Sequence, residues 1–193
     1  MNIEETLKKT RSYRRFYQEK PVTQDQLTTL IRCASLTPSG GNKMPLKYIT
    51  VTNPQTNAAI FDCVGWAAYL PDWNGPSEGE KPAAYIVMLR DTSLSKATAT
   101  DEGIQALAIM LAATEQGLGG CIMGNVQREK LTAALDITAP YEVALVLALG
   151  VPKEEVVIEK VPADGNIKYW HDENGIHHVP KRTQEEILVK RYE

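Results

Sequence analysis

The chain has 193 residues, of which 43% are hydrophobic and 23% are charged, and its formal net charge is −3 at pH 7. This composition is typical of a globular protein, and the length is sufficient to bury a core without disulfides. The negative net charge and the lack of a basic tract argue against binding to a nucleic-acid backbone.

Cysteine usage and the apolar segments bear on the cellular compartment. Cys33, Cys63 and Cys121 are odd in number and far apart, which is typical of reduced thiols and not of a disulfide framework. The N-terminus lacks the apolar core of a signal peptide, and the longest apolar run, residues 143–149, is too short to span a bilayer. We therefore expect a cytoplasmic protein that has no membrane partner.

The first elements in chain order are two helices and a strand. Residues 3–9 predict a short helix. Thr23, with Gln26 three residues later, forms a capping box that opens a second helix, and Pro38 stops it. The apolar face of that second helix is expected at Leu27, Leu30, Ile31 and Ala34. Residues 46–52, rich in β-branched and aromatic side chains, predict a strand.

The middle of the chain alternates helices, loops and strands. Asn53 is expected to cap a helix over residues 54–64. Residues 65–82 are rich in glycine and proline and predict a loop, with a short helix near residues 66–69 as an option. Residues 83–89 predict a buried strand.

The clearest helix is predicted over residues 101–116, with Thr100 as its N-cap and Gly117 as its terminator. Its expected core face consists of Ile104, Leu107, Ala108, Leu111 and Ala112, and small residues such as Ala106 and Ala113 widen that face. A glycine-rich segment, residues 117–125, follows. Residues 128–135 then predict a helix, and residues 142–149 predict a strand covered on both faces.

The C-terminal part has a different character. Residues 156–161 predict a strand, and turns are expected at residues 164–166 and 174–175. The remaining residues have little core-forming periodicity. A segment of this kind either lies across a partner subunit or forms a loosely packed extension. We treat residues 1–193 as one domain with an extended C-terminal segment at about residues 151–193.

Three motifs can be set aside. Residues 75–79 match the pattern G-x-S-x-G, but they lie in a proline-rich loop and lack the strand and helix that a nucleophile elbow needs. Gly119 and Gly124 have P-loop spacing without the required lysine, and no dinucleotide fingerprint is complete. His171, His177 and His178 lack the spacing of a zinc-binding helix, so we expect no metal site.

Two polar segments point to a ligand. Arg11, Ser12, Arg14 and Arg15 bring guanidinium groups together, and such groups suit a phosphate or a pyrimidine carbonyl. A second polar, glycine-rich loop, residues 38–42, follows the next helix. Together they favour a mononucleotide ligand over a solvated basic turn. The glycines of residues 117–125 indicate either close approach of a flat ligand or simple turn chemistry.

The segments resemble those of the FMN-dependent nitroreductase family, in the family's order, over about residues 6–188. The first is R-S-x-R-x-F at residues 11–16. The others are P-S-G-G-N at residues 38–42, G-L-G-G-C with a later glycine at residues 117–124, L-G-x-P at residues 149–152 and V-P-K-R at residues 179–182. The region over residues 65–82, which helps to form the family's substrate mouth, is short here.

The resemblance implies an α+β fold, in which helices flank a mostly antiparallel central sheet and the C-terminal extension reaches the partner subunit. It implies a homodimer with FMN at the interface. Arg11, Lys181 and Arg182 would meet the phosphate, and Ser12 and Arg14 the ribityl chain or the pyrimidine edge. Pro38, Ser39, Gly40 and Asn42 would line the flavin of the same or the partner subunit. Backbone N–H groups of Gly124 and Asn125 would lie near the redox nitrogen.

The implied activity is reduction of nitroaromatic, quinone or similar small acceptors by ping-pong hydride transfer, with NAD(P)H as electron donor. No catalytic side chain beyond FMN is required. The alternative is a flavin-binding carrier or regulatory protein without turnover. A relative that carries out dehalogenation or flavin fragmentation, and a plain phosphate-ligand binding module, are further options.

Overall fold

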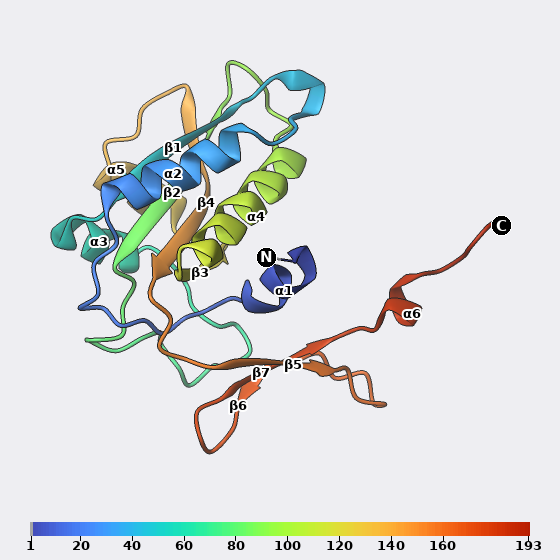
Figure 1. Ribbon diagram of the computed structural model, residues 1–193. Helices are drawn as coiled ribbons and strands as arrows, with labels where there is room; N and C mark the ends of the chain where they lie inside the picture. The colour runs from blue at the N-terminus through green and yellow to red at the C-terminus, as the bar shows by residue number, and fades with distance from the viewer. Residues whose placement is uncertain (1) are drawn as a thin grey trace.

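A computed structural model describes residues 2–193 (Figure 1). At its centre is a four-stranded antiparallel sheet with strand order β1-β2-β4-β3. The strands are β1 (Leu46–Val51), β2 (Ala84–Asp91), β3 (Gly119–Met123) and β4 (Tyr141–Gly150). The predicted α+β class with a mostly antiparallel sheet is confirmed.

Helices cover both faces of this sheet (Figure 1). On one face lie α2 (Gln24–Ser35) and α4 (Ala99–Glu115), and on the other lie α3 (Pro54–Phe61) and α5 (Arg128–Ala134). Successive side chains of β2 alternate between the two cores: Ala84, Ile86 and Met88 pack with α2 and α4, whereas Tyr85, Val87 and Leu89 pack on the other side. A strand buried on both faces has no polar side, which explains its continuous apolar run.

Local signals set most of the element ends. The capping box of Thr23 and Gln26 opens α2, and Asn53 accepts a hydrogen bond from the amide of Thr56 at the start of α3. Gly117 takes φ +72° just after α4, a left-handed conformation that glycine adopts without strain. The first helix, α1 (Ile3–Lys9), also forms where it was predicted.

Some boundaries differ from the predictions. The helix α3 ends at Phe61 instead of residue 64, and residues 66–69 form no helix. The helix α4 begins at Ala99 with Thr98 at its N-cap, so Thr100 lies inside the first turn. These differences of one to three residues arise at helix ends, which fray and have the least sharply defined limits.

The buried face of α4 was predicted only in part. Ala106 and Ala113 are buried as expected, but Leu107 is 44% exposed, and Ile104, Ala108, Leu111 and Ala112 are half-buried. The other buried side chains are Asp101, Glu102, Gln105, Ile109 and Met110. The polar ones are buried because each has a partner, such as Arg90 for Glu102. A helix with apolar residues on every side does not reveal its core face by periodicity alone.

The C-terminal segment forms a small separate sheet in the order β5-β7-β6. Its strands are β5 (Val156–Lys160), β6 (Trp170–His171) and β7 (His177–Lys181), with β5 and β7 parallel. The short helix α6 (Gln184–Ile187) and the last residues then run away from the body (Figure 1). Within residues 2–193, no helix has the length and apolar character needed to cross a membrane.

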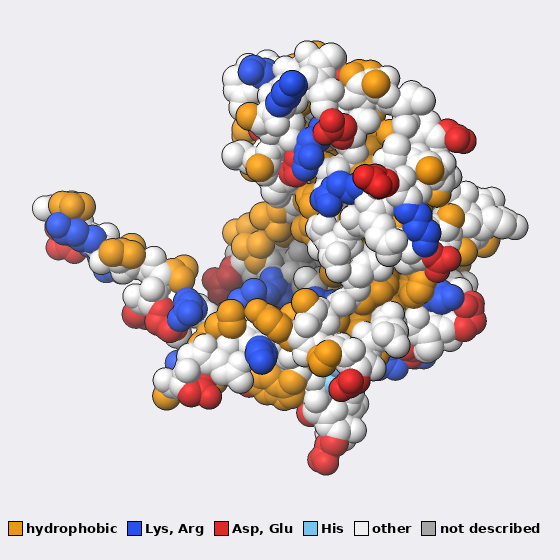
Figure 2. All heavy atoms as spheres, turned by 180° about the vertical axis from the view of Figure 1, so that it is seen from behind, with side chains coloured by type: hydrophobic (Ala, Val, Ile, Leu, Met, Phe, Trp, Pro, Cys, Tyr) orange, Lys and Arg blue, Asp and Glu red, His pale blue; other side chains and the backbone are white. Residues whose placement is uncertain are grey.

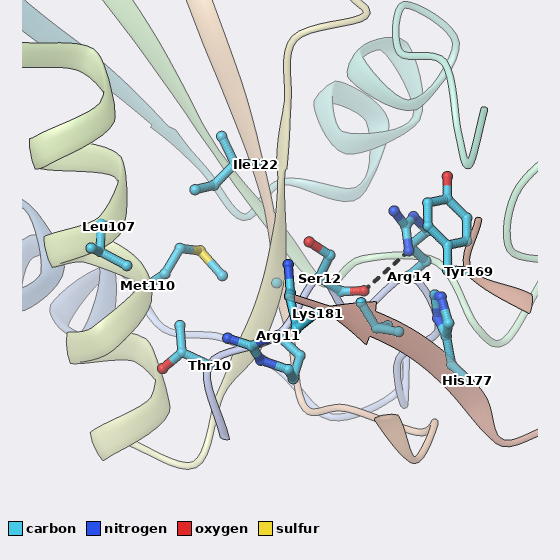
Figure 3. A pocket seen from close by; sticks show the side chains of 12 residues that line it. Thr10, Arg11, Ser12, Arg14, Leu107, Met110, Ile122, Tyr169, His177 and Lys181 are labelled. Atoms are coloured by element: carbon cyan, nitrogen blue, oxygen red, sulfur yellow. Dashed lines mark hydrogen bonds between the residues drawn. The ribbon is translucent and has the colours of Figure 1, made fainter. Parts of the chain in front are cut away.

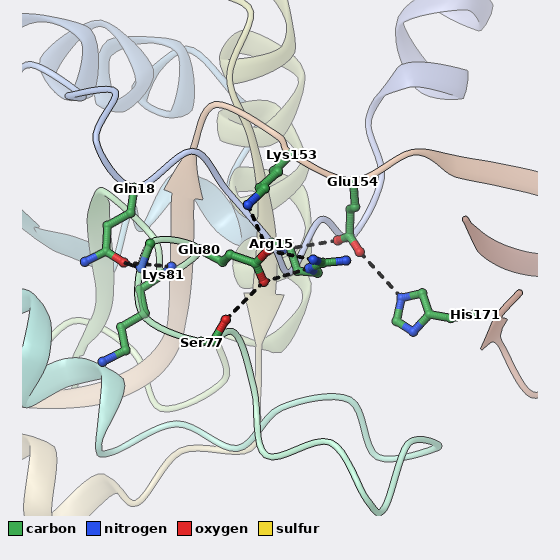
Figure 4. Close-up of polar contacts among 9 residues, drawn as sticks. Arg15, Gln18, Ser77, Glu80, Lys81, Lys153, Glu154 and His171 are labelled. Carbon is green, nitrogen blue, oxygen red and sulfur yellow. Dashed lines mark hydrogen bonds and ion pairs between the residues drawn. The ribbon is translucent and has the colours of Figure 1, made fainter. Parts of the chain in front are cut away.

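A network around Glu80 holds the loop before β2 to two other segments (Figure 4). Arg15 donates to both carboxylate oxygens of Glu80, at 2.8 and 2.6 Å, and Lys153 lies 3.0 Å from Oε1. The Glu80 side chain is only 12% exposed. Hydrogen bonding to Arg15, with further help from Lys153, lowers the pKa of Glu80 to about 2.

Replacement of this carboxylate, as in Glu80→Gln, should lower the free energy of unfolding at pH 7 by roughly 1–3 kcal/mol, because Arg15 and Lys153 lose their charge partner. Because the pKa is depressed in the folded state, the stabilisation is present above the unfolded value of about 4.3 and is lost as the pH falls toward 2. Urea denaturation of both proteins at several pH values tests this.

The matched control is Glu78→Gln, because Glu78 is exposed and its two contacts, an ion pair with Lys81 and a hydrogen bond from Gln18, lie at the surface. We expect this variant to unfold like the wild type. If Glu80→Gln and the wild type have the same stability at pH 7, or if their difference does not shrink in acid, the network does not stabilise the fold.

Candidate functional site

One cavity of about 310 Å³ lies between α4, β3, the segment after α1 and the C-terminal strands (Figure 3). It contains four of the residues predicted to bind a ligand, namely Arg11, Ser12, Arg14 and Lys181. The other residues that line it are Thr10, Leu107, Met110, Gly120, Ile122, Tyr169, His177 and Val179. The cavity therefore joins segments from both ends of the chain.

Three cations face this cavity without a carboxylate partner. Arg11, Arg14 and Lys181 form no ion pair within the described residues. Arg11 donates to the carbonyl oxygen of Leu7 at 2.8 Å, while its buried Nε has no hydrogen-bond partner in the part of the chain that the structure describes. Burial lowers the pKa of Arg11. Uncompensated positive charge of this kind favours an anionic ligand.

Arg14 is positioned by its neighbours. Its guanidinium lies 4.7 Å from the centre of the Tyr169 ring and donates to the carbonyl oxygen of Ser12 at 3.3 Å. Its backbone amide donates to Glu154, which also accepts from the amide of Arg15. Protein contacts therefore fix both the backbone and the guanidinium group of Arg14, so its position does not depend on a ligand.

The opposite wall of the cavity is apolar. Leu107 and Met110 come from α4, and Ile122 comes from β3 (Figure 3). Leu107 and Ile122 are 44% and 41% exposed, which is high for large aliphatic side chains. Figure 2 shows this side of the molecule hollowed between the main body and the C-terminal segment, with hydrophobic and basic side chains around the hollow. Such a site suits a ligand with a charged end and an apolar, flat body.

Gly119 and Gly120 shape the floor of the cavity. A Cβ at Gly120 would lie 2.2 Å from the carbonyl oxygen of Ala148, and a Cβ at Gly119 would lie 2.5 Å from the Tyr13 ring. The amide of Tyr13 donates to the carbonyl oxygen of Gly120 at 2.9 Å. Gly119 therefore allows the arginine segment to lie against β3, and Gly120 allows β3 to lie close to β4. The sequence patterns indicated neither reason for glycine.

The loop over residues 38–42 lies apart from the cavity of the same chain. Ser39 donates to Asp101 at 2.5 Å, and the amide of Gly40 donates to the same carboxylate at 2.9 Å, near the start of α4. Pro38 and Asn42 belong to the same exposed or half-buried loop. A flavin contact by this loop stays a prediction, which within the resemblance can apply to the partner subunit.

Gly124 and Asn125 follow the end of β3 and are exposed. They do not line the cavity, although Gly120 and Ile122 of the same strand do. Arg182 follows the end of β7, does not line the cavity, and lies 3.6 Å from Glu186. Their predicted flavin contacts are not tested by this geometry of a single chain.

Several lining residues were missed by the motif-based reasoning. His177, Val179 and Lys181 occupy alternate positions of β7 and therefore share one face of the strand. This alternation could have identified His177 and Val179 as lining residues together with Lys181. Leu107, Met110 and Ile122 carried no such signal, because similar residues fill the core.

Comparison with known proteins places the fold. The model of the nitroreductase family matches residues 7–151, which is more than half of the chain. A curated relative, 5,6-dimethylbenzimidazole synthase of Rhodospirillum rubrum, is 27% identical over 168 residues, covering 73% of this chain and 78% of the relative.

Two solved structures show the same fold. A nitroreductase family protein from Clostridium novyi NT has a TM-score of 0.65 and 26% identity, covering 79% of this chain and 88% of that protein. The NADPH:FMN oxidoreductase of Vibrio harveyi, in complex with NAD+, has a TM-score of 0.65 and 24% identity, covering 85% and 75% of the respective chains.

The cavity floor makes a prediction about stability. Gly120→Ala should lower the free energy of unfolding by roughly 1–3 kcal/mol, because its Cβ would overlap a backbone oxygen that has no room to move. Gly124→Ala is the control, since the nearest atom to its Cβ would be a Leu145 methyl at 3.9 Å. Urea denaturation compares the two, and equal stability of both variants would contradict the proposed packing role.

Proposed function

Because the chain belongs to the nitroreductase family, we propose that it is an FMN-dependent oxidoreductase that uses NAD(P)H to reduce small acceptors such as nitroaromatics or quinones. The observation that carries this proposal is the cavity in which Arg11, Arg14 and Lys181 lack carboxylate partners and face an apolar wall. The Vibrio harveyi protein, whose name gives FMN and NADPH and whose structure holds NAD+, supports the choice of cofactor and donor.

The residues of the cavity fit FMN. Arg11 and Lys181 would hold the phosphate, since the buried Nε of Arg11 is a donor without a partner in the described chain. Ser12 and Arg14 would contact the ribityl chain or the polar edge of the ring. The flat ring would pack against the apolar wall. A volume of about 310 Å³ is near the lower end for ligand sites, so we infer that a second copy of the chain completes the site.

Two features support a homodimer. The face of α4 that carries Leu107 is apolar and half-exposed. The C-terminal tail leaves the body with Ile187 at 66%, Val189 at 96% and Tyr192 at 85% exposed. Apolar surfaces of this kind are typical of interfaces between subunits. In such a dimer, Pro38, Ser39, Gly40 and Asn42 would line the partner's flavin, and the backbone of Gly124 and Asn125 would lie near the ring.

FMN, when bound, supplies the hydride chemistry. The protein's own side chains would bind FMN and orient it. Arg14 would place positive charge beside the polar edge of the bound group, and fixed positive charge in a site shielded from water stabilises added negative charge more than water does. Leu107 and Ile122 would cover the apolar body of that group. NAD(P)H and the acceptor would use the same opening in turn, which gives ping-pong kinetics without a dinucleotide-binding motif.

The alternative is a flavin-binding carrier or regulatory protein without turnover. The relative named 5,6-dimethylbenzimidazole synthase also shows that the family includes more than one reaction, and fold alone does not select among reactions. The acceptor is therefore assigned here only by class.

The cations of the cavity can be tested directly. The double variant Arg11→Ala with Arg14→Ala should bind FMN about a hundredfold more weakly and purify without yellow colour, because two charge-assisted contacts of roughly 1.5 kcal/mol each are removed. Fluorescence titration with FMN measures the loss. Arg32→Ala on α2, an arginine outside the cavity, should bind FMN like the wild type. Unchanged affinity in a folded double variant would contradict the assignment of this cavity.

Turnover separates the enzyme from the carrier. Under anaerobic conditions, NADH or NADPH should bleach the flavin absorbance of the wild-type protein, and a nitroaromatic or a quinone should restore it. A carrier would keep its colour with either nicotinamide. Conversion of the flavin to a benzimidazole in air, detected by mass spectrometry, would instead support the chemistry named for the Rhodospirillum rubrum relative.

A further inference from the structure

Glu154, His171 and His177 converge just behind the wall of the cavity. One ligand atom from each, Glu154 Oε2 among them, lies within 4.8 Å of the other two. His171 Nε2 is 3.6 Å and His177 Nδ1 is 3.7 Å from Glu154 Oε2. Figure 4 shows Glu154 and His171 pointing toward each other. The carboxylate follows β4, and the imidazoles of His171 and His177 come from β6 and β7, so three segments meet here.

All three facing atoms are buried and without a hydrogen-bond partner in the described chain. The side chains of Glu154 and His177 are each 1% exposed, and that of His171 is 25% exposed. The separations of 3.6 and 3.7 Å are too long for hydrogen bonds. A buried polar atom without a partner costs roughly 1–3 kcal/mol, so three that face one another indicate a missing partner between them.

The geometry suits a metal ion. Ligand bonds of about 2.0–2.1 Å in a tetrahedral site separate the ligand atoms by about 3.3 Å. The two separations between carboxylate and imidazole, 3.6 and 3.7 Å, are only a few tenths of an ångström longer, and all three ligand atoms lie within 4.8 Å of one another. Two imidazoles and one carboxylate form a donor set that binds zinc, with water in the fourth position.

The surroundings of Glu154 also match those of a metal ligand. Its second oxygen, Oε1, accepts hydrogen bonds from the amides of Arg14 and Arg15, which fixes the direction of Oε2. Arg15 is paired with Glu80 at 2.6 Å. This pairing offsets the positive charge of Arg15 and so reduces its repulsion of a divalent cation bound at Glu154.

We propose that Glu154, His171 and His177 form a binding site for a divalent transition-metal ion of the zinc class. The absence of a metal was expected from the sequence because the histidines do not share a helix. The ligands instead come from the segment after β4 and from the strands β6 and β7. An ion bound there would fasten β6 and β7 to the end of β4 and so hold the Arg14 and Lys181 sides of the cavity together.

His178 offers a contrast within the same strand. Its ring nitrogens contact two different carboxylates on opposite sides, Glu159 at 2.5 Å and Asp172 at 3.3 Å. These groups satisfy the ring and do not surround one point. His178→Gln is therefore a matched control for His171→Gln.

The test uses the full chain without a polyhistidine tag, treated with EDTA and then dialysed against Zn²⁺ or Mg²⁺. Elemental analysis should find about one zinc per wild-type chain. Zn²⁺, but not Mg²⁺, should raise the unfolding temperature, because a ligand that binds only the folded state stabilises it. Added Co²⁺ should give the visible absorption of a tetrahedral site.

In Glu154→Gln and His171→Gln, zinc affinity should fall at least about tenfold and the Co²⁺ absorption should disappear, whereas His178→Gln should behave like the wild type. Glu154→Gln keeps an oxygen for the amides of Arg14 and Arg15, so we expect it to fold. If the wild type retains no zinc, or if the three variants bind it equally well, the site does not exist. Flavin content is measured separately, so a failure here leaves the proposed function untouched.

Discussion

The arginine segment after α1 depends on one set of main-chain contacts. It lies between β3 and the chain that leaves β4. On one side the amide of Tyr13 donates to the carbonyl oxygen of Gly120. On the other side the amide of Tyr17 donates to the carbonyl oxygen of Val151, and the amide of Lys153 donates to that of Arg15. These backbone contacts place the arginines at the edge of the sheet. Every feature of the cavity follows from them, because the same chain then continues into β5 and β7 and brings Lys181 opposite Arg11.

This arrangement leaves positive charge without an internal counterpart. Two other partly buried cations, Arg15 and Arg90, are paired with carboxylates, those of Glu80 and Glu102. The cations of the cavity differ from these because no carboxylate of the described chain pairs with them, so a bound anion would have to supply the negative charge. Desolvated charge of this kind lowers stability unless a ligand compensates it, so binding and folding are linked here.

The C-terminal strands are the less firmly anchored part of the structure. They add no strand to the central sheet, and their links to it pass through a few side chains, Glu154 and Tyr169 among them. Tyr169 contacts both Arg14 and Tyr69. A buried cluster of carboxylate and imidazoles at this junction is therefore in a place where one bound ion would have a large effect on the geometry of the cavity.

Much of the secondary structure could be read from short-range signals. The capping box at Thr23, the cap at Asn53, the left-handed Gly117 and the apolar runs of β2 and β4 each act within a few residues, and each produced the expected element. The arginine cluster and Lys181 could likewise be identified as candidates for anion binding from residue type alone.

Only the tertiary structure decided which residues meet. The core face of α4 could not be deduced, because Gln105 and Glu102 are buried by partners on β1 and β2 that no local pattern reveals. The meeting of Glu154 with His171 and His177 depends on the pairing of β6 with β7 and on how these strands return to the end of β4. Propensities and caps act over one or two turns of chain, whereas such convergence is set by packing between segments that are far apart in sequence.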